Sequence, residues 1–148
     1  MLTPFDDEYF MKEAYKEAMY AFEENEVPIG AVVVCNNKII ARAHNQTEKL
    51  TDVTAHAEMI ALTSAANYLG SKYLDECTLY ITLEPCVMCA GALNWAQLKR
   101  LVFGAFDEKY GFKKAGSSLL HPKTEMVSGV MAAECSKILK DFFGRLRD

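Results

Sequence analysis

The sequence predicts an α/β protein whose mixed sheet is covered by helices on both faces. Helical and extended segments alternate in the order α-β-β-α-β-α-β-(β)-α. The 148 residues contain 51% hydrophobic and 24% charged side chains, which is the composition of an ordinary globular protein. No repeat, low-complexity segment or Pro/Gly/Ser-rich linker divides the chain, so we expect residues 1–148 to form one domain.

The first half of the chain predicts a helix, a β-hairpin and a second helix. Apolar residues recur near helical spacing over 6–25, and Pro28 breaks any continuation of that helix. Two β-branched runs then flank Asn36 and Asn37, which is typical of a hairpin. A segment of helix formers follows Thr54, the expected N-cap. The expected ranges are a helix at 6–25, strands at 29–35 and 38–43, a loop at 44–54 and a helix at 55–69.

The second half of the chain alternates strand and helix. Gly70 and Ser71 end the second helix, and a strand begins at Cys77. Pro85 suits the first turn of the next helix. A loop region that contains Gly and Lys residues separates the fourth strand from a short fifth strand. The expected ranges are strands at 77–83, 100–104 and 125–130, helices at 85–98 and 131–146, and a loop at 105–124.

The net charge of −4 is concentrated near the N-terminus. Residues 1–26 carry eight acids and two bases, so the other 122 residues have a net charge of +2 and leave room for a nucleic-acid partner. The chain start lacks the basic and apolar regions of a secretory signal, and no apolar run approaches the roughly 20 residues of a membrane span. The five cysteines have no disulfide-framework spacing. We therefore expect a cytoplasmic protein with reduced thiols and no membrane partner.

Two short motifs carry the chemistry: His56-Ala57-Glu58 and, 27 residues later, Pro85-Cys86-Val87-Met88-Cys89. Together they offer one imidazole and two thiolates, the ligand set of a zinc deaminase. Structural zinc sites normally have four protein ligands, whereas catalytic sites leave one position open for water. Each motif opens a predicted helix, where free backbone N–H groups favour thiolates and a metal-bound hydroxide. We expect His56, Cys86 and Cys89 to bind one Zn²⁺.

Glu58 is the expected catalytic acid and base. It lies two residues beyond His56, about 200° around a helix, so it does not share the ligand direction but stays near the metal. A carboxylate there suits the transfer of a proton from water to a ring nitrogen and then to departing ammonia. The expected reaction is hydrolytic deamination.

Other interpretations exist for each motif alone. A PCxxC sequence also occurs in redox sites and structural zinc sites, and an isolated HAE is ordinary helix composition. A fourth ligand from Cys77, His44 or His121 would make the site structural. The remotest alternative is a zinc-stabilised binding protein without turnover, in which Glu58 would have no role. The joint occurrence of the motifs favours catalysis.

The chain resembles the cytidine/deoxycytidylate deaminase superfamily and, within it, the bacterial tRNA-specific adenosine deaminases. The resemblance implies a three-layer α/β/α cytidine-deaminase-like fold with a five-stranded sheet, one Zn²⁺ per subunit and a homodimer. It also implies conversion of adenosine to inosine at the wobble position of a tRNA anticodon loop. The matching segments are 27–34, 54–58, 79–92, 102–105 and 141–143.

The resemblance implies further site residues. Asn45 would hydrogen-bond the flipped base, and the backbone around Ala57, Glu84 and Pro85 would line the pocket. Candidate RNA contacts come from the residues themselves, since lysines interleaved with aromatic residues can bind phosphates and stack on bases. An ordinary solvated loop is an equal alternative for the lysines. The candidates are Lys109, Lys113, Lys114, Arg145 and Arg147.

The segment from Asn94 to Gln97 resembles guanine deaminases more than the tRNA enzymes. A deaminase of a free base or nucleoside, of the guanine or cytosine type, is therefore the second hypothesis. Trp95 in this segment is expected in the core or at a dimer interface.

Overall fold

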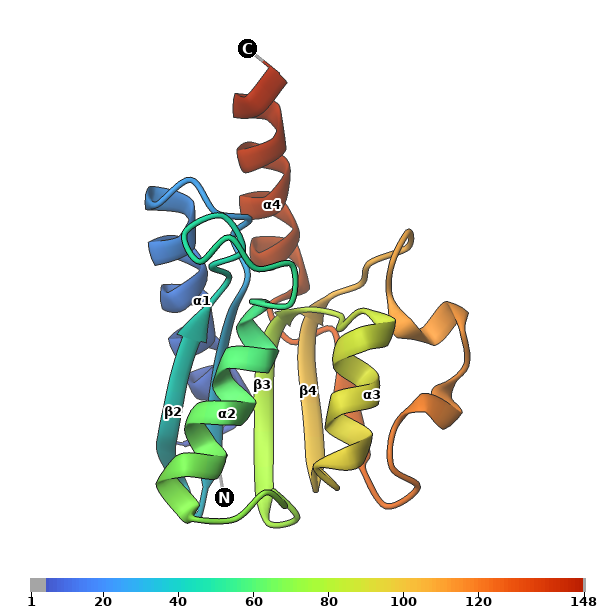
Figure 1. The fold of residues 1–148 in the computed structure, drawn as a ribbon. Coiled ribbons are helices and arrows are strands. Elements are labelled where there is room, and N and C mark those ends of the chain that lie inside the picture. Colours follow the sequence, from blue (N-terminus) through green and yellow to red (C-terminus); the bar gives the residue numbers. More distant parts are fainter. Residues whose placement is uncertain (1–4, 148) are drawn as a thin grey trace.

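A five-stranded mixed sheet with helices on both faces forms the framework of the protein, as the sequence predicts (Figure 1). The computed structural model describes residues 5–147, apart from the side chains of Ser117 and Arg147. The strand order is β2-β1-β3-β4-β5, in which β2, β1 and β3 pair antiparallel and β3, β4 and β5 pair parallel. No helix in this described range is both long and apolar enough to cross a membrane.

The elements follow the predicted order. The strands are β1 (Gly30–Cys35), β2 (Lys38–His44), β3 (Cys77–Leu83), β4 (Arg100–Ala105) and β5 (Glu125–Ser128). The helices are α1 (Asp7–Glu23), α2 (Ala57–Leu69), α3 (Val87–Trp95) and α4 (Ala132–Arg147), with two 3₁₀ helices, η1 (Phe112–Lys114) and η2 (Ser117–Leu119). The hairpin between β1 and β2 turns at Asn36 and Asn37, whose φ angles of 53° and 60° suit a two-residue hairpin turn.

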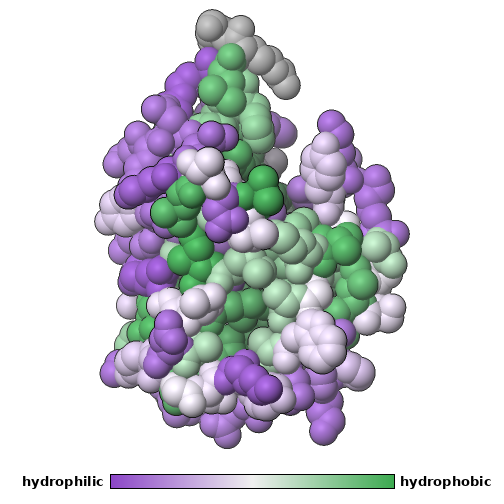
Figure 2. Space-filling view, in the orientation of Figure 1, coloured by the Kyte–Doolittle hydropathy of each residue, from purple (hydrophilic) through white to green (hydrophobic). Residues whose placement is uncertain are grey.

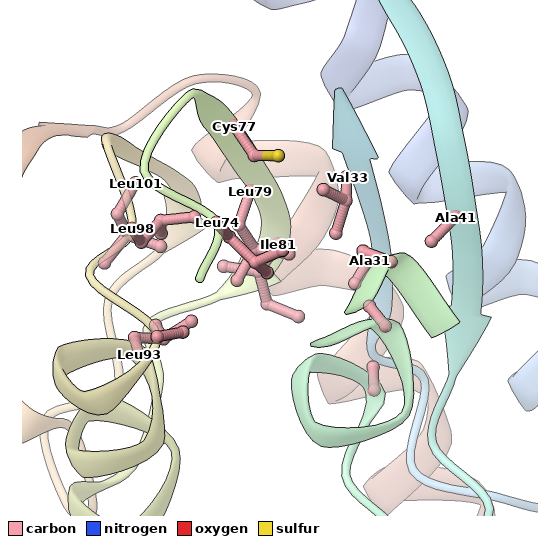
Figure 3. Close-up of a cluster of buried hydrophobic side chains, with 14 of the residues drawn as sticks. Ala31, Val33, Ala41, Leu74, Cys77, Leu79, Ile81, Leu93, Leu98 and Leu101 are labelled. Carbon is pink, nitrogen blue, oxygen red and sulfur yellow. The ribbon is translucent and has the colours of Figure 1, made fainter. Parts of the chain in front are cut away.

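Alternation along β1 divides the core into two layers. Ala31 and Val33 face α2 and α3, where they join the cluster shown in Figure 3. Val32 and Val34 face the opposite side and pack with residues of α1. Because both faces of the central strands are covered, these strands are nearly continuous apolar runs. The metal motifs start α2 and α3, so the site belongs to one layer only.

Gly30 lets α1 approach the sheet closely. A Cβ atom at Gly30 would lie 2.1 Å from the carbonyl oxygen of Ala14 and 2.4 Å from the backbone nitrogen of Ala18. No side chain fits in that space, so the helix backbone rests directly on the start of β1.

A bidentate ion pair ties the start of α1 to β4. Arg100 Nη1 and Nη2 donate to the two carboxylate oxygens of Asp7 at 2.6 and 2.8 Å. The Tyr80 hydroxyl donates to Asp7 Oδ1 at 2.7 Å. The hydrogen bonds from Arg100 are the main reason that the pKa of Asp7 is lowered from its ordinary value.

Two predictions about helix starts are wrong. Thr54 is not the N-cap of α2, because its backbone N–H and hydroxyl both donate to Asp52 Oδ1 in a local turn. His56 is the N-cap instead. Pro85 is not in the first turn of α3, because Cys86 occupies the N-cap position. Both corrections place a metal-ligand candidate at the helix boundary itself.

The ends of two further segments also differ from expectation. The third helix ends at Trp95 rather than near residue 98, since Gln97 has a φ of 56°, outside the helical range. The loop expected at 105–124 contains the two 3₁₀ helices, which sequence periodicity cannot distinguish from irregular turns.

Replacing Asp7 by Asn should destabilise the fold by about 1–2 kcal/mol near neutral pH, because it removes a partly buried charge-assisted pair. The pKa of Asp7 is lower in the folded state than its ordinary value of 3.8. The stability from this pair is therefore fully present above that value and disappears as pH falls through the lowered pKa. Urea denaturation of the wild type and the variant from pH 7 to pH 3 measures the free energy of unfolding of each. The difference between the two free energies should become smaller as the pH falls. A difference that does not depend on pH would contradict this assignment.

Candidate metal centre and its pocket

The N-termini of α2 and α3 lie at the same edge of the sheet, and each supplies metal-ligand candidates (Figure 1). His56 and Cys86 are the two N-caps, both with extended backbone. Neither side chain makes the usual capping hydrogen bond to its own helix. Both side chains are thus free to turn toward one another and toward Cys89 in the first turn of α3.

The ligand atoms have the spacing of a tetrahedral zinc site. His56 Nδ1 lies 3.7 Å from Cys86 Sγ and 3.4 Å from Cys89 Sγ, and all three atoms lie within 4.8 Å of one another. Ordinary zinc–sulfur and zinc–nitrogen bonds at tetrahedral angles place a sulfur and a nitrogen about 3.5 Å apart. The residues present therefore fit a zinc ion. Of the residues described, no other His, Cys, Asp or Glu joins this cluster.

The thiols of Cys86 and Cys89 differ in pKa. The hydrogen bond between them lowers the pKa of Cys86 to about 4 and raises the pKa of Cys89. The nearby His56 ring also favours the Cys86 thiolate, and this contact raises the pKa of the imidazole. A thiolate is the form of cysteine that binds metal, so the site is electrostatically prepared for a cation.

Glu58 is buried beside the cluster, in the first turn of α2. Burial raises its pKa to about 7, and its carboxyl lies within hydrogen-bonding reach of Cys89. A carboxyl group with a pKa near neutrality can both accept and release a proton at neutral pH. The role of Glu58 as catalytic acid and base stays a prediction.

A pocket of about 300 Å³ opens beside the metal ligands. Residues of four separate segments of the chain form its walls. The lining residues are Ile29, His56, Glu58, Leu83, Glu84, Cys86, Asp107 and Tyr110. A larger hollow of about 780 Å³ lies elsewhere, between the ends of α1 and α4, and contains none of the metal ligands.

Three of the four residues expected at the pocket, Asn45, Ala57 and Pro85, are not among those that line it. Ala57 and Pro85 are buried in the protein, whereas their neighbours in sequence face the pocket. Asn45 lies behind the lining, where its backbone N–H donates to the carbonyl of Ile29 at 3.1 Å. Its buried Oδ1 has no hydrogen-bond partner in the described part of the chain. Glu84 lines the pocket as expected.

Asp107 and Tyr110 line the pocket, yet sequence reasoning did not assign them to it. Both follow β4, a parallel strand, and binding sites of α/β sheets form outside the carboxyl ends of parallel strands. That rule was the available signal for Asp107. Tyr110 is 65% exposed and had no signal other than its aromatic character.

The three candidate lysines lie on the same loop as these lining residues. All three are exposed, and two stand over aromatic rings of the loop. Lys109 Nζ lies 5.4 Å from the ring centroid of Tyr110, and Lys113 Nζ lies 5.2 Å from that of Phe106. The loop therefore brings positive charge, from Lys114 as well, and aromatic surface to the side of the pocket.

Arg145 is engaged within the chain. Its Nη2 donates to the Phe22 carbonyl at 3.3 Å and to Asn25 Oδ1 at 3.0 Å, and its guanidinium stacks on the Phe22 ring at 4.3 Å. These contacts join α4 to the end of α1, and Arg145 is not among the residues that line the pocket. The side chain of Arg147 lies outside the described residues.

Comparison with known proteins finds close relatives over nearly the whole chain. The family described as MafB19-like deaminase matches residues 5–147. The tRNA-specific adenosine deaminase of Bacillus subtilis (strain 168) is 49% identical over 146 residues, which are 95% of this chain and 91% of the relative. That of Aquifex aeolicus is 43% identical over 145 residues, which are 95% of this chain and 96% of the relative.

Two solved structures are also similar. One comes from a study of A-to-I editing by tRNA:A34 deaminases at the wobble position of transfer RNA. It is 42% identical with a TM-score of 0.83, and the match covers 88% of this chain and 99% of that chain. The other is guanine deaminase from Bacillus subtilis, 37% identical with a TM-score of 0.67 over 75% of this chain and 70% of that chain.

Replacing Cys86 by Ser should weaken zinc binding by more than about 100-fold, because one of three protein ligands is lost. Replacing Cys35 by Ser is the matched control, since Cys35 is a free thiol on β1 outside the cluster. To measure the loss of zinc, both variants are dialysed against a chelator. Their metal content is then determined by inductively coupled plasma mass spectrometry. Equal zinc content in the two variants would refute the ligand assignment.

Proposed function

The chain belongs to the MafB19-like deaminase family, and we propose that it is a zinc-dependent hydrolase that converts adenosine to inosine at the wobble position of tRNA. One structural observation carries the proposal. A three-residue metal centre opens onto a pocket with the buried carboxyl of Glu58 beside it. The choice of substrate is supported by relatives whose names specify tRNA adenosine.

Each residue of the site has a distinct task in this reaction. When zinc is bound by His56, Cys86 and Cys89, it supplies a Lewis acid and lowers the pKa of a water in the open position to about 7. Glu58 carries one proton of the attacking water to the ring nitrogen, and it carries a second proton, released when the added hydroxyl becomes a carbonyl, to the departing amine. Asn45 is next to the lining residue Ile29 and is not itself in the lining. Its Oδ1, unpartnered among the described residues, is the proposed acceptor of a hydrogen bond from the base once the base has entered the pocket. The change replaces the amine of the base by a carbonyl and releases ammonia.

A wobble base is a suitable substrate for such a pocket. It stands in a single-stranded loop, so moving it into an enclosed site costs little base pairing. We propose that Lys109, Lys113 and Lys114 contact phosphates beside the flipped base, since they are exposed on the loop that forms one side of the pocket. The acidic helix α1 packs on the opposite face of the sheet and does not oppose RNA there.

We also propose a homodimer formed through the face of α2 and α3. Figure 2 shows hydrophobic side chains gathered over these helices. Trp95 is 85% exposed at the end of α3, so the expectation of core packing for it is wrong and an interface is its better explanation. The other exposed apolar residues of this face include Tyr68, Leu69, Tyr73, Val87 and Met88.

The cellular setting follows from the thiols. All five cysteines are free, including the pair in the metal centre. Free thiols persist in reducing compartments, so we propose that the enzyme acts in the cytoplasm as one deaminase domain.

A guanine deaminase is the second candidate. The 37% identity to the guanine deaminase structure supports it, as does the resemblance of the segment from Asn94 to Gln97. The first candidate is favoured because its relatives match 95% of this chain with higher identity.

The zinc-loaded protein should form inosine in an anticodon stem-loop that carries adenosine at the wobble position. It should release little ammonia from free guanine, cytosine or adenosine. The KM for the stem-loop should rise with salt, since phosphate contacts to lysines weaken as counterions compete. Ammonia release from guanine alone would contradict the proposal in favour of the second candidate.

In the same assay, replacing Glu58 by Gln should lower kcat by about 10²–10⁴-fold with zinc retained, because the proton carrier is lost. Glu23→Gln, an exposed change on α1, is the control and should keep normal turnover. Retained deamination by the Glu58 variant would refute its role.

Replacing Trp95 by Lys should convert the dimer to a monomer, because it places a charge in the apolar face. Light scattering on a gel-filtration column should give twice the chain mass of 16.6 kDa for the wild type and one chain mass for the variant. Phe143→Lys changes an exposed apolar residue on α4 and should stay dimeric. A dimer in both variants would place the interface elsewhere.

A further inference from the structure

We propose that Glu84 is a positioning residue whose buried carboxylate fixes residues 106–113, the pocket loop, as one wall of the metal pocket. This proposal rests on the proposed function, because it assigns the wall that a base would meet. The resemblance implied only that backbone near Glu84 lines the pocket. The side chain carries the new role.

Both carboxylate oxygens of Glu84 are used to hold the loop. Oε1 accepts the backbone N–H of Asp107 at 3.1 Å, and Oε2 accepts the backbone N–H of Lys113 at 3.0 Å. Glu84 is only 5% exposed, so few water molecules compete for these oxygens. An ionised carboxylate accepts two such hydrogen bonds at once, whereas an amide would point an NH₂ group at one of the donors. The residue at 84 must therefore be an acid to hold both ends of the loop.

The loop also packs against Glu84 with no space left. A Cβ atom at Gly111 would lie 2.4 Å from both Cδ and Oε2 of Glu84. The N–H of Phe112 donates to the carbonyl of Pro85 at 2.9 Å, and Gly111 forms a β-bridge with Cys86. The pocket loop is thus held against Glu84, Pro85 and Cys86, and the last of these is a metal-ligand candidate.

Fixing the loop places two lining residues of the pocket. Asp107 and Tyr110 both belong to the pocket loop, and Asp107 Oδ1 accepts the N–H of Tyr110 at 2.9 Å. Movement of the loop would shift these two side chains relative to His56 and Glu58. Because both oxygens of Glu84 accept loop N–H groups, Glu84 acts on the pocket through the position of the loop.

Glu26 provides a matched comparison elsewhere in the chain. Its buried carboxylate accepts the N–H groups of Glu48 and Lys49 at 3.1 and 2.7 Å. The hydrogen-bond pattern is the same, but neither of these loop residues lines the metal pocket. A glutamine at Glu26 therefore reproduces the general cost of losing a buried anchor without releasing the pocket loop.

Hydrogen–deuterium exchange on the zinc-loaded protein tests the anchor directly. In Glu84→Gln, exchange over residues 106–113 should quicken by about tenfold or more, because a charge-assisted anchor is lost. In Glu26→Gln, the acceleration should fall around residues 48 and 49 instead. Equal protection of the pocket loop in wild type and Glu84→Gln would overturn the proposal.

Kinetics with the anticodon stem-loop test the consequence for the substrate. Glu84→Gln should keep its zinc and raise KM by about tenfold with a smaller fall in kcat, since one lost charge-assisted hydrogen bond corresponds to roughly that factor. Glu108→Gln, an exposed acid on the same loop, should behave as wild type. A large fall in kcat with unchanged KM, as for a proton carrier, would overturn the positioning role.

Gly111→Ala disturbs the same contact from the loop side. It is a second test of the proposal if Glu84→Gln does not fold. It should reproduce both the faster exchange and the higher KM. The hydrogen–deuterium exchange experiment requires no substrate. It therefore tests the role of Glu84 as an anchor even if the wild-type protein deaminates no RNA. Conversely, a protected loop in an active enzyme would reject this inference while the proposed function stands.

Discussion

The meeting of two helix N-termini at one edge of the sheet is the constraint on which the site depends. His56 and Cys86 are N-caps with extended backbone and without capping hydrogen bonds, so their side chains are free to face one another. The free N–H groups of both helices and their positive dipole ends surround the thiols. The pKa of the Cys86 thiol is lowered to about 4 mainly by its hydrogen bond with Cys89, and next by its hydrogen bond with His56. A different register of β3 would move Cys86 and Cys89 away from His56.

Two buried acids beside the candidate metal centre have different surroundings, and these suit the different roles proposed for them. Both carboxylate oxygens of Glu84 accept backbone N–H groups of the pocket loop. Burial dominates at Glu58 and raises its pKa to about 7. The environment of Glu84 suits a side chain that holds the backbone of a loop, and the environment of Glu58 suits a group that gains and loses a proton. Partners, and not residue type, therefore separate the anchor from the acid–base group.

The arrangement of layers reconciles an acidic chain with the proposed RNA substrate. The acids of the first 26 residues belong mostly to α1, which packs against Val32 and Val34. The metal motifs start helices on the face of Ala31 and Val33. The sheet thus separates the acidic helix from the side that carries Lys109 and Lys113. Net charge alone would have given a misleading view of the partner.

The sequence by itself determined the element order, the three ligand candidates and Glu58, because strand and helix periodicity and the HAE and PCxxC spacings are local properties. It did not determine that His56, rather than Thr54, caps α2, because that depends on the turn at Asp52. The sequence also did not predict that Asp107 and Tyr110 line the pocket, or that Trp95 is exposed. Asp107 and Tyr110 reach the pocket because β4 pairs with β3 and because the loop after β4 is hydrogen-bonded to Glu84. Contacts between residues far apart in the chain decided these placements, and periodicity carries no information about such contacts.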